Sequence, residues 1–233
     1  MTNVALVTGA GRGIGLELCR QLLTRGFTVV GCPRIGGSDG LGQLVREHPQ
    51  RTFEVPMDVG DDASVASAAA DVGQFVDHLD LLINNAGIYP EDDGGVERLE
   101  LRKLVDAFDV NALGALRVTR AMLPLLRRGS GKRVIQMTSL MGSVGDNTSG
   151  GSYAYRMSKA ALNMANRNLA HELGREGFLC LAIHPGWVQT RMGGSAAPLG
   201  LSPAVEQILE NALESGRDDH GGFKGPGRAN LPF

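Results

Sequence analysis

Residues 4–15 read VALVTGAGRGIG, four apolar residues that lead into a turn with glycines at positions 9, 11, 13 and 15. The nearly continuous apolar run over 4–7 is typical of a strand that is buried on both faces of a parallel sheet. Apolar residues then recur at positions 14, 18, 22 and 23, which is the spacing of a helix. This stretch therefore predicts a strand, a tight glycine turn and a helix over 15–24.

Similar short apolar runs recur along the chain, separated by segments with helical spacing. We expect further strands over residues 27–32, 53–59, 79–83, 134–137 and 179–183, and a short last strand in GGFKG at 221–225. No linker divides the chain. The alternation predicts one α/β domain over residues 1–233, with a doubly wound, mostly parallel sheet of about seven strands and helices on both faces.

The composition excludes several classes of protein. A formal net charge of −2 leaves no basic excess of the kind that a nucleic-acid surface needs. The apolar runs are too short for a membrane span, and the first residues lack the pattern of a signal peptide. The three cysteines have no metal-ligand spacing, and Cys19 and Cys180 lie in patterns typical of buried free thiols. We expect a cytoplasmic protein with no metal site, nucleic-acid partner or membrane anchor.

The glycines after the first strand indicate a nucleotide site. The spacing Gly9-x-x-x-Gly13-x-Gly15 lets the backbone approach a pyrophosphate, whose charge then meets the N-terminus of a helix. The general pattern G-x-G-x-x-G does not fit, because position 14 is isoleucine. Such a turn also occurs where a strand simply meets a helix, but its place after the first strand favours a bound dinucleotide.

Two arginines favour NADP(H) over NAD(H) as this dinucleotide. An NAD site places an acid at the end of the second strand to accept a hydrogen bond from the ribose 2′-hydroxyl, but this chain has no acid there before Asp39. Arg34, at that strand end, and Arg12, in the glycine turn, carry planar guanidiniums that suit a 2′-phosphate. The alternative is that both are solvated surface arginines.

The later strands also end in polar residues, and ligands of α/β sheets bind at that edge. Asp58 follows the third strand as either a helix cap or an acceptor for an adenine amino group. NNAG at 84–87 follows the fourth as either an ordinary turn or a cover for the adenine ring. Ser139 follows the fifth, but no G-x-S-x-G elbow surrounds it. A Ser-His-Asp hydrolase therefore has no support.

Tyr155 and Lys159 lie four positions apart in YAYRMSK at 153–159, at the start of a predicted helix. That spacing puts both side chains on one helix face, about 5–6 Å apart between Cβ atoms, whereas Tyr153 points elsewhere. A nearby ammonium and a cationic nicotinamide ring would lower the phenol pKa from about 10 by about three units, a shift of roughly 4 kcal/mol. The pair therefore predicts proton transfer by Tyr155.

In this order, the motifs resemble those of the short-chain dehydrogenase/reductase family. They are TGAGRGIG (8–15), Asp58, NNAG (84–87), Asn111 in DVNALG, Ser139 in TSLMGS, Tyr155-x-x-x-Lys159 and PGWVQT (185–190). The stretches DNTSGGSYAYRMSKAALN and HPGWVQTRMGG are similar to the carbonyl-reductase subgroup that includes sniffer-type and C-factor-like proteins. The resemblance implies a Rossmann fold with a cofactor half over about 1–130 and a catalytic and substrate half over about 131–233.

The resemblance also implies residue roles. Tyr155 would be the general acid that protonates a carbonyl oxygen as NADPH delivers hydride, or the base in reverse. Lys159 would lower the pKa of Tyr155 and hold the nicotinamide ribose, Ser139 would hydrogen-bond the substrate oxygen, and Asn111 would hold a water that links Lys159 to solvent. With the two arginines, the expected cofactor contacts are Gly9, Arg12, Gly13, Ile14, Gly15, Arg34, Asp58, Val59, Asn85, Ala86, Gly87, Tyr155, Lys159, Pro185, Gly186, Val188 and Thr190.

The substrate side carries fewer signals. Trp187 and Met141, joined by Tyr89 and Met192, either wall the substrate pocket or pack as ordinary loop residues.

We expect an NADPH-dependent oxidoreductase that reduces a small, fairly apolar aldehyde or ketone. The alternatives are an NAD(P)+-dependent alcohol dehydrogenase, which runs the same residues backwards, and an NADP(H)-binding signalling or regulatory protein, which has no need of all four catalytic positions. The resembled family includes homodimers and homotetramers, and the subgroup includes monomers, so the oligomeric state stays open.

Overall fold

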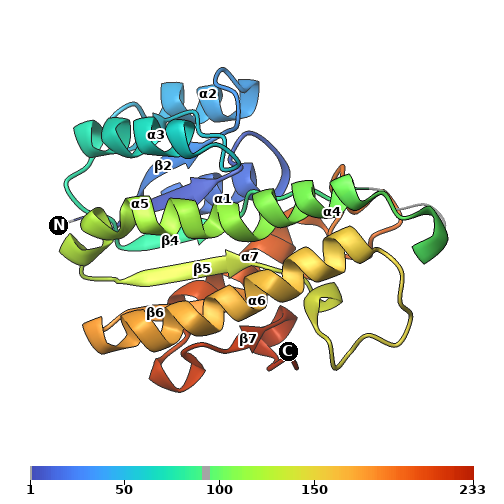
Figure 1. The fold of residues 1–233 in the computed structure, drawn as a ribbon. Coiled ribbons are helices and arrows are strands. Elements are labelled where there is room, and N and C mark those ends of the chain that lie inside the picture. The colour runs from blue at the N-terminus through green and yellow to red at the C-terminus, as the bar shows by residue number, and fades with distance from the viewer. Residues whose placement is uncertain (1, 91–94) are drawn as a thin grey trace.

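Parallel strands form one sheet through the molecule (Figure 1). The computed structural model describes residues 2–90 and 95–233, and within these residues the sheet has seven strands in the order β3-β2-β1-β4-β5-β6-β7. The strands are β1 (Val4–Thr8), β2 (Thr28–Cys32), β3 (Thr52–Glu54), β4 (Leu81–Asn84), β5 (Arg133–Met137), β6 (Leu179–Ile183) and β7 (Phe223–Lys224). All neighbouring strands are parallel, which confirms the predicted sheet.

Helices cover both faces of the sheet. One face is packed by α1 (Gly13–Thr24), α2 (Asp39–Glu47) and α7 (Leu201–Glu214), and the other by α3 (Asp62–Phe75), α5 (Gly114–Arg128) and α6 (Tyr153–Leu173). A further helix, α4 (Leu101–Phe108), packs against α6. Short helical turns are η1 (Val96–Arg98), η2 (Asp109–Leu113), η3 (Leu140–Gly142), η4 (Gly174–Glu176), η5 (Arg217–Asp219) and η6 (Pro226–Arg228).

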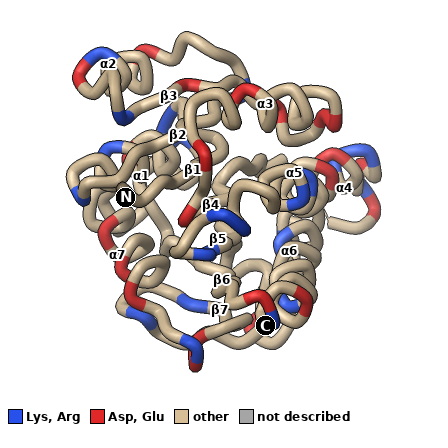
Figure 2. The backbone as a smooth tube through the Cα atoms, turned by 90° about the vertical axis from the view of Figure 1, so that its left-hand side faces the viewer, with Lys and Arg blue, Asp and Glu red and all other residues tan. Residues whose placement is uncertain are grey.

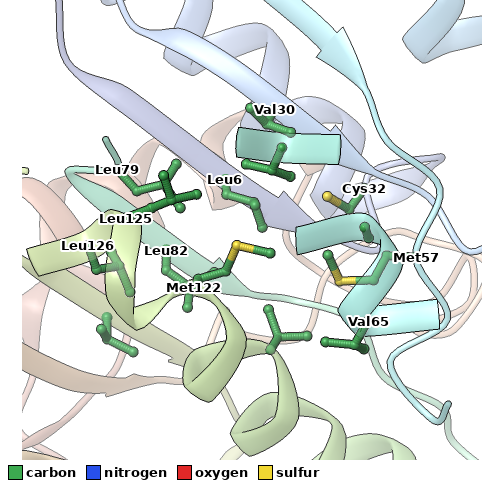
Figure 3. Packing of buried hydrophobic residues seen from close by; sticks show 14 of the residues in the cluster. Leu6, Val30, Cys32, Met57, Val65, Leu79, Leu82, Met122, Leu125 and Leu126 are labelled. Atoms are coloured by element: carbon green, nitrogen blue, oxygen red, sulfur yellow. The ribbon is translucent and has the colours of Figure 1, made fainter. Parts of the chain in front are cut away.

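Each strand divides its side chains between two hydrophobic layers, because successive residues point to opposite faces. Leu6 of β1 packs in the layer that contains Met122 and Leu125 of α5, and Figure 3 shows these side chains meeting. The next residue, Val7, packs in the layer of α1, α2 and α7. The central strands are therefore buried on both sides, as their continuous apolar runs predict.

The third strand is shorter than predicted. It ends at Glu54 instead of continuing to Val59, because Pro33, directly after β2, has no N–H to donate to the segment that follows β3. Val55 N and Met57 N still donate to Gly31 O and Pro33 O, at 3.0 and 2.8 Å. The chain after β3 thus runs beside β2 to the carboxyl edge of the sheet, where Asp58 was expected.

The cysteines lie in the core, and the charged side chains are spread over the surface. Cys19 and Cys180 are buried and free, as predicted, and so is Cys32. Basic and acidic residues are interspersed around the molecule (Figure 2). Among the described residues, no helix is long and apolar enough to cross a membrane, and no group of three His, Cys, Asp or Glu side chains is placed to hold a metal ion.

Candidate active site

A groove of about 520 Å³ runs along the carboxyl edge of the sheet. The strand order brings the ends of β1, β4, β5 and β6 together at this edge. The structure places most of the expected cofactor contacts on its walls: Gly9, Arg12, Gly13, Ile14, Gly15, Arg34, Asp58, Val59, Asn85, Ala86, Gly87, Tyr155, Lys159, Pro185 and Thr190.

The glycine turn forms the floor of one end of the groove by close backbone packing. A Cβ atom at Gly15 would lie 2.2 Å from Gly9 O, so this position accepts only glycine. Asn85 anchors the turn, because its Nδ2 donates to Thr8 O at 2.9 Å. Thr8 Oγ1 also accepts from Asn85 N and Ala86 N, both at 3.0 Å. The helix after the turn begins at Gly13, two residues before its predicted start, and its N-terminus opens on the groove.

The two arginines lie exposed on the walls of this end of the groove. Arg12 is the N-cap residue of α1, and Arg34 follows β2. Asp58 is the acid among the groove residues that the structure describes, whereas Glu54 lies outside the groove and its Oε1 accepts from Gly37 N at 2.5 Å. Both guanidiniums are therefore placed to meet an anion that enters the groove.

The β5 end and α6 bring Ser139, Tyr155 and Lys159 together. Ser139 lies beside the Tyr155 phenol and favours its ionised form, and Lys159 Nζ lies 5.6 Å from the centroid of the Tyr155 ring. A glycine makes this approach possible, since a Cβ at Gly142 would lie 2.7 Å from the carbonyl carbon of Lys159. Four-residue spacing on α6 thus places Tyr155 and Lys159 on one face, as predicted, while Tyr153 is exposed.

The pKa of Tyr155 differs from the expectation that Lys159 lowers it. Burial raises the pKa of Tyr155 to about 12, the hydrogen bond with Ser139 opposes this rise, and the neighbouring Tyr89 adds to it. Burial also lowers the pKa of Lys159 to about 8, and its Nζ donates to Met137 O at 2.8 Å instead of to the phenol. The residues of the chain therefore hold Tyr155 as a neutral phenol, a proton donor, at neutral pH.

Asn111 connects the segment after β4 to α6. It lies in η2, a π-helical turn between α4 and α5, and its side chain is buried. Its Oδ1 accepts from Ile88 N at 2.7 Å, and its Nδ2 donates to Ile88 O and to Ser158 Oγ, both at 2.9 Å. Ser158 Oγ in turn donates to Tyr155 O at 2.8 Å. A role for Asn111 in holding a water stays a prediction.

Some expected residues do not line the groove. Val188 is buried and pairs with Leu199, and Gly186 lies outside the groove in the same loop. Trp187 is 56% exposed, and its Nε1 donates to Gly193 O at 2.7 Å. Met141 follows Ser139 in η3 and also lies off the groove. Met192, in contrast, is part of the groove wall.

The groove also contains residues that were not among the expected contacts. These are Gly11, Pro33, Ile35, Ser38, Met57, Ile88, Val110, Met137, Thr138 and Arg191. Most lie within a residue or two of a predicted contact, at the same strand ends. Adjacency to those contacts was the signal that could have found them.

Comparisons with known proteins agree with this architecture. The family model for short chain dehydrogenases matches residues 3–198. C-signal of Myxococcus xanthus is 47% identical over 147 residues, which cover 62% of this chain and 86% of that protein. The structure of carbonyl reductase Sniffer of D. melanogaster superposes with a TM-score of 0.94 at 31% identity, with all of both chains covered.

An NADPH-bound carbonyl reductase from chicken fatty liver superposes with a TM-score of 0.92 at 31% identity, and the match covers 100% of this chain and 99% of that one. These relatives include both subgroup names that the sequence resembles, a Sniffer carbonyl reductase and a C-signal protein. The matched family model covers every motif from the glycine turn to PGWVQT. The chain belongs to the short-chain dehydrogenase family.

Proposed function

We propose that the chain is an NADPH-dependent oxidoreductase that reduces a small aldehyde or ketone to an alcohol. The observation that carries the proposal is the Tyr155 phenol, which lies on the wall of the groove with Lys159 on the same helix face and Ser139 beside it. The similarity to two carbonyl reductases, one of them NADPH-bound, supports the same reaction.

The groove residues fit NADPH. Close packing at Gly15 and Gly9 leaves room for a pyrophosphate against the backbone, and the N-terminus of α1 favours its negative charge. Arg12 and Arg34 are exposed at the same end and suit the 2′-phosphate. When bound, this cofactor supplies the hydride.

The chain itself supplies the proton and the orientation of the substrate. In the proposed reaction Ser139 donates a hydrogen bond to the carbonyl oxygen, and Tyr155 gives its phenolic proton to that oxygen as the alcohol forms. The negative charge then left on Tyr155 is stabilised by the buried ammonium of Lys159 on the same helix face. A high Tyr155 pKa suits an acid that must be protonated before each turnover.

A signalling or regulatory role is the second candidate, because one relative is named C-signal. A protein that only senses the dinucleotide has no use for the Ser139–Tyr155 pair, so catalysis separates the two candidates. The reverse reaction, oxidation of an alcohol with NADP+, uses the same residues in the opposite direction.

The test is NADPH oxidation with a panel of aldehydes, ketones and quinones. We expect turnover by the wild-type chain and a loss of about a hundredfold or more in kcat for Tyr155→Phe, which removes only the acidic hydroxyl. NADPH binding, followed by thermal shift, is retained in this variant. An inactive wild type, or full activity in Tyr155→Phe, overturns the catalytic proposal.

A further inference from the structure

We infer that Tyr89 is a positioning residue of this active site: its ring braces Tyr155, and its hydroxyl holds the start of α6. The inference deepens the proposed function and rests on it for its kinetic consequences. Tyr89 lies in the segment after β4, and its neighbour Ile88 lines the groove.

The first observation is a contact between two aromatic rings. The ring centroids of Tyr89 and Tyr155 are 4.7 Å apart, with the ring planes tilted by 52°. This separation lies within the range of favourable aromatic pairs, which is about 4.5–7 Å. Tyr89 therefore covers part of the phenol that we propose as the proton donor, and limits the directions in which that ring can move.

The second observation is the partner of the Tyr89 hydroxyl. Tyr89 Oη lies 2.8 Å from Ser152 Oγ, at the residue that precedes α6. Ser152 has φ 46° and ψ 45°, in the left-handed region, and the two preceding glycines also have positive φ. A non-glycine residue is strained in this region, so it needs contacts that hold it there. The Ser152 side chain makes no cap hydrogen bond to α6, and its hydroxyl is available to Tyr89.

The third observation is that the backbone beside Tyr89 is fixed. Asn111 binds both the N–H and the carbonyl of Ile88, and it also binds Ser158, which donates to Tyr155 O. Asn111 and Ser158 thus connect the backbone of Ile88 to the backbone carbonyl of Tyr155, while the rings of Tyr89 and Tyr155 are in direct contact. A ring mounted on such a fixed backbone can impose its position on its neighbour.

The chain offers a matched control for this role. Tyr153 is 37% exposed and Tyr89 is 39% exposed, and both lie within two residues of an active-site residue. Tyr153 starts α6 but points away from Lys159, and no ring contact joins it to Tyr155 among the described residues. A variant of Tyr153 therefore shows the effect of losing an exposed tyrosine, and a variant of Tyr89 shows the added effect of losing the ring contact with Tyr155.

The kinetic test compares Tyr89→Ala, Tyr89→Phe and Tyr153→Ala in the reduction of one carbonyl substrate. We expect Tyr89→Ala to lower kcat about tenfold to a hundredfold, since misplacement of a reacting group by about 1 Å has effects of this size. Tyr89→Phe keeps the ring and retains kcat within about fivefold, since it loses a single hydrogen bond. Tyr153→Ala matches the wild type. The Kd for NADPH is unchanged in all three, because neither Tyr89 nor Tyr153 lines the groove.

The pH profile gives a readout that a merely structural role would not move. Both burial and Tyr89 raise the pKa of Tyr155, and Lys159, whose pKa burial lowers to about 8, faces the same ring. Tyr89→Ala is therefore expected to shift the higher-pH part of the alkaline limb of kcat, which Tyr155 sets, to lower pH. Tyr89→Phe, which preserves most of the burial, shifts it less. An unchanged limb together with unchanged kcat in Tyr89→Ala overturns the inference, and so does an equal loss in Tyr153→Ala.

A measurement without turnover separates this inference from the proposed function. The chain has three tyrosines, so fluorotyrosine labelling gives three fluorine NMR resonances that Tyr→Phe variants assign. We expect Tyr89→Ala to shift and broaden the Tyr155 resonance, and Tyr89→Phe to leave it nearly in place. If Tyr155→Phe remains active, the proposed function fails alone. If Tyr155→Phe is inactive but Tyr89→Ala leaves the Tyr155 resonance unmoved, the role of Tyr89 fails alone.

Discussion

The turn after β1 and the turn after β5 lie at the same edge of the sheet, but they are held in different ways. The β1 turn is packed by backbone against backbone, with Gly15 directly under Gly9 O. The β5 turn packs closely against the backbone of α6 at Gly142, but it is otherwise held by side chains of α6. Arg156 donates to Met141 O at 3.3 Å, to Gly150 O at 3.1 Å and to Ser149 Oγ at 2.9 Å.

This difference matches what each turn has to do in the proposed reaction. A turn built from backbone presents N–H groups that suit the phosphates of a cofactor, which are the same in every turnover. A turn that is tied by side chains can change shape through single substitutions while the sheet below it is unaltered. The β1 turn should therefore tolerate almost no substitution. Single substitutions in the β5 turn should instead each change activity by a moderate amount.

The largest effect is expected at the β1 turn, for Gly15→Ala. The added Cβ meets a carbonyl oxygen that cannot move without β1, and overpacking of this kind costs about 3 kcal/mol or more. We expect a lower melting temperature and loss of measurable NADPH binding. The matched control is Gly73→Ala in α3, where a Cβ meets nothing within 4 Å. It should be neutral or stabilising, and normal NADPH binding by Gly15→Ala would contradict the rigid turn.

The next effect concerns the buried Lys159 beside the β5 turn. Its pKa falls from 10.5 to about 8 on folding, so between these values the unfolded chain binds more protons and stability rises with pH. Below pH 8 the buried charge destabilises the fold. Lys159→Met should therefore raise the free energy of unfolding at pH 7, by up to about 3 kcal/mol, although reduction is lost.

Urea unfolding at a series of pH values checks this prediction. The advantage of Lys159→Met should shrink as the pH rises from about 8 towards 10.5. Lys132→Met is the control, because Lys132 Nζ donates to Glu176 O at the surface and is not buried as Lys159 is. A variant that is less stable than the wild type at every pH would show that the Lys159 hydrogen bond to Met137 outweighs its burial.

A third effect tests the side-chain part of the cofactor end. Arg34→Ala and Arg12→Ala should each reduce the ratio of kcat/KM for NADPH over NADH by about ten- to a hundredfold, since hydrogen bonds to charged groups contribute about 1.5–3 kcal/mol. Arg46 on α2 is exposed and does not line the groove, so the control variant Arg46→Ala should leave the ratio unchanged. A wild type that prefers NADH would end the argument for the arginines.

The smallest effect is expected for Arg156→Ala in the β5 turn. Three hydrogen bonds disappear, but they lie near the surface and contribute about 1 kcal/mol each at most, so we expect a fall in kcat/KM of about five- to tenfold. Arg156→Lys keeps the charge but lacks the planar guanidinium, so its kcat/KM should lie between those of the wild type and Arg156→Ala. NADPH affinity stays constant. A change in NADPH affinity as large as that in kcat/KM would show that the two turns are not independent.

Strands that are buried on both faces were predictable from sequence, because a continuous apolar run can be identified without knowing which strand lies beside it. The 179–183 run matches β6 residue for residue, and GGFKG contains the two residues of β7. The third strand was predicted too long, because its apolar residues continue beyond Pro56 into the core beside α3. Hydrophobicity reports burial there, and it carries no information about which backbone groups pair.

The active site shows the same division. The spacing of Tyr155 and Lys159 on one helix is a local property, and the sequence carries it. The pKa of Tyr155 depends on how deeply its ring is buried by segments far away in the chain, and so its direction was not predictable from that spacing. The brace by Tyr89 lies beyond sequence reasoning for the same reason, since it joins a segment after β4 to a helix more than sixty residues later.

Because η2 is a π-helical turn, the number of residues between α4 and α5 matters for the active site. Over Asp109–Leu113 the helix fits one residue more than an α-helical turn would, and Asn111 points at Ile88 because of that extra residue. Deleting one residue here would let α4 and α5 fuse into a regular helix. The helix before and after the deletion would keep its orientation, and the residues of the turn itself would change the direction in which they point. A deletion that removes no reacting group would therefore break the hydrogen bonds of Asn111 to Ile88 and Ser158.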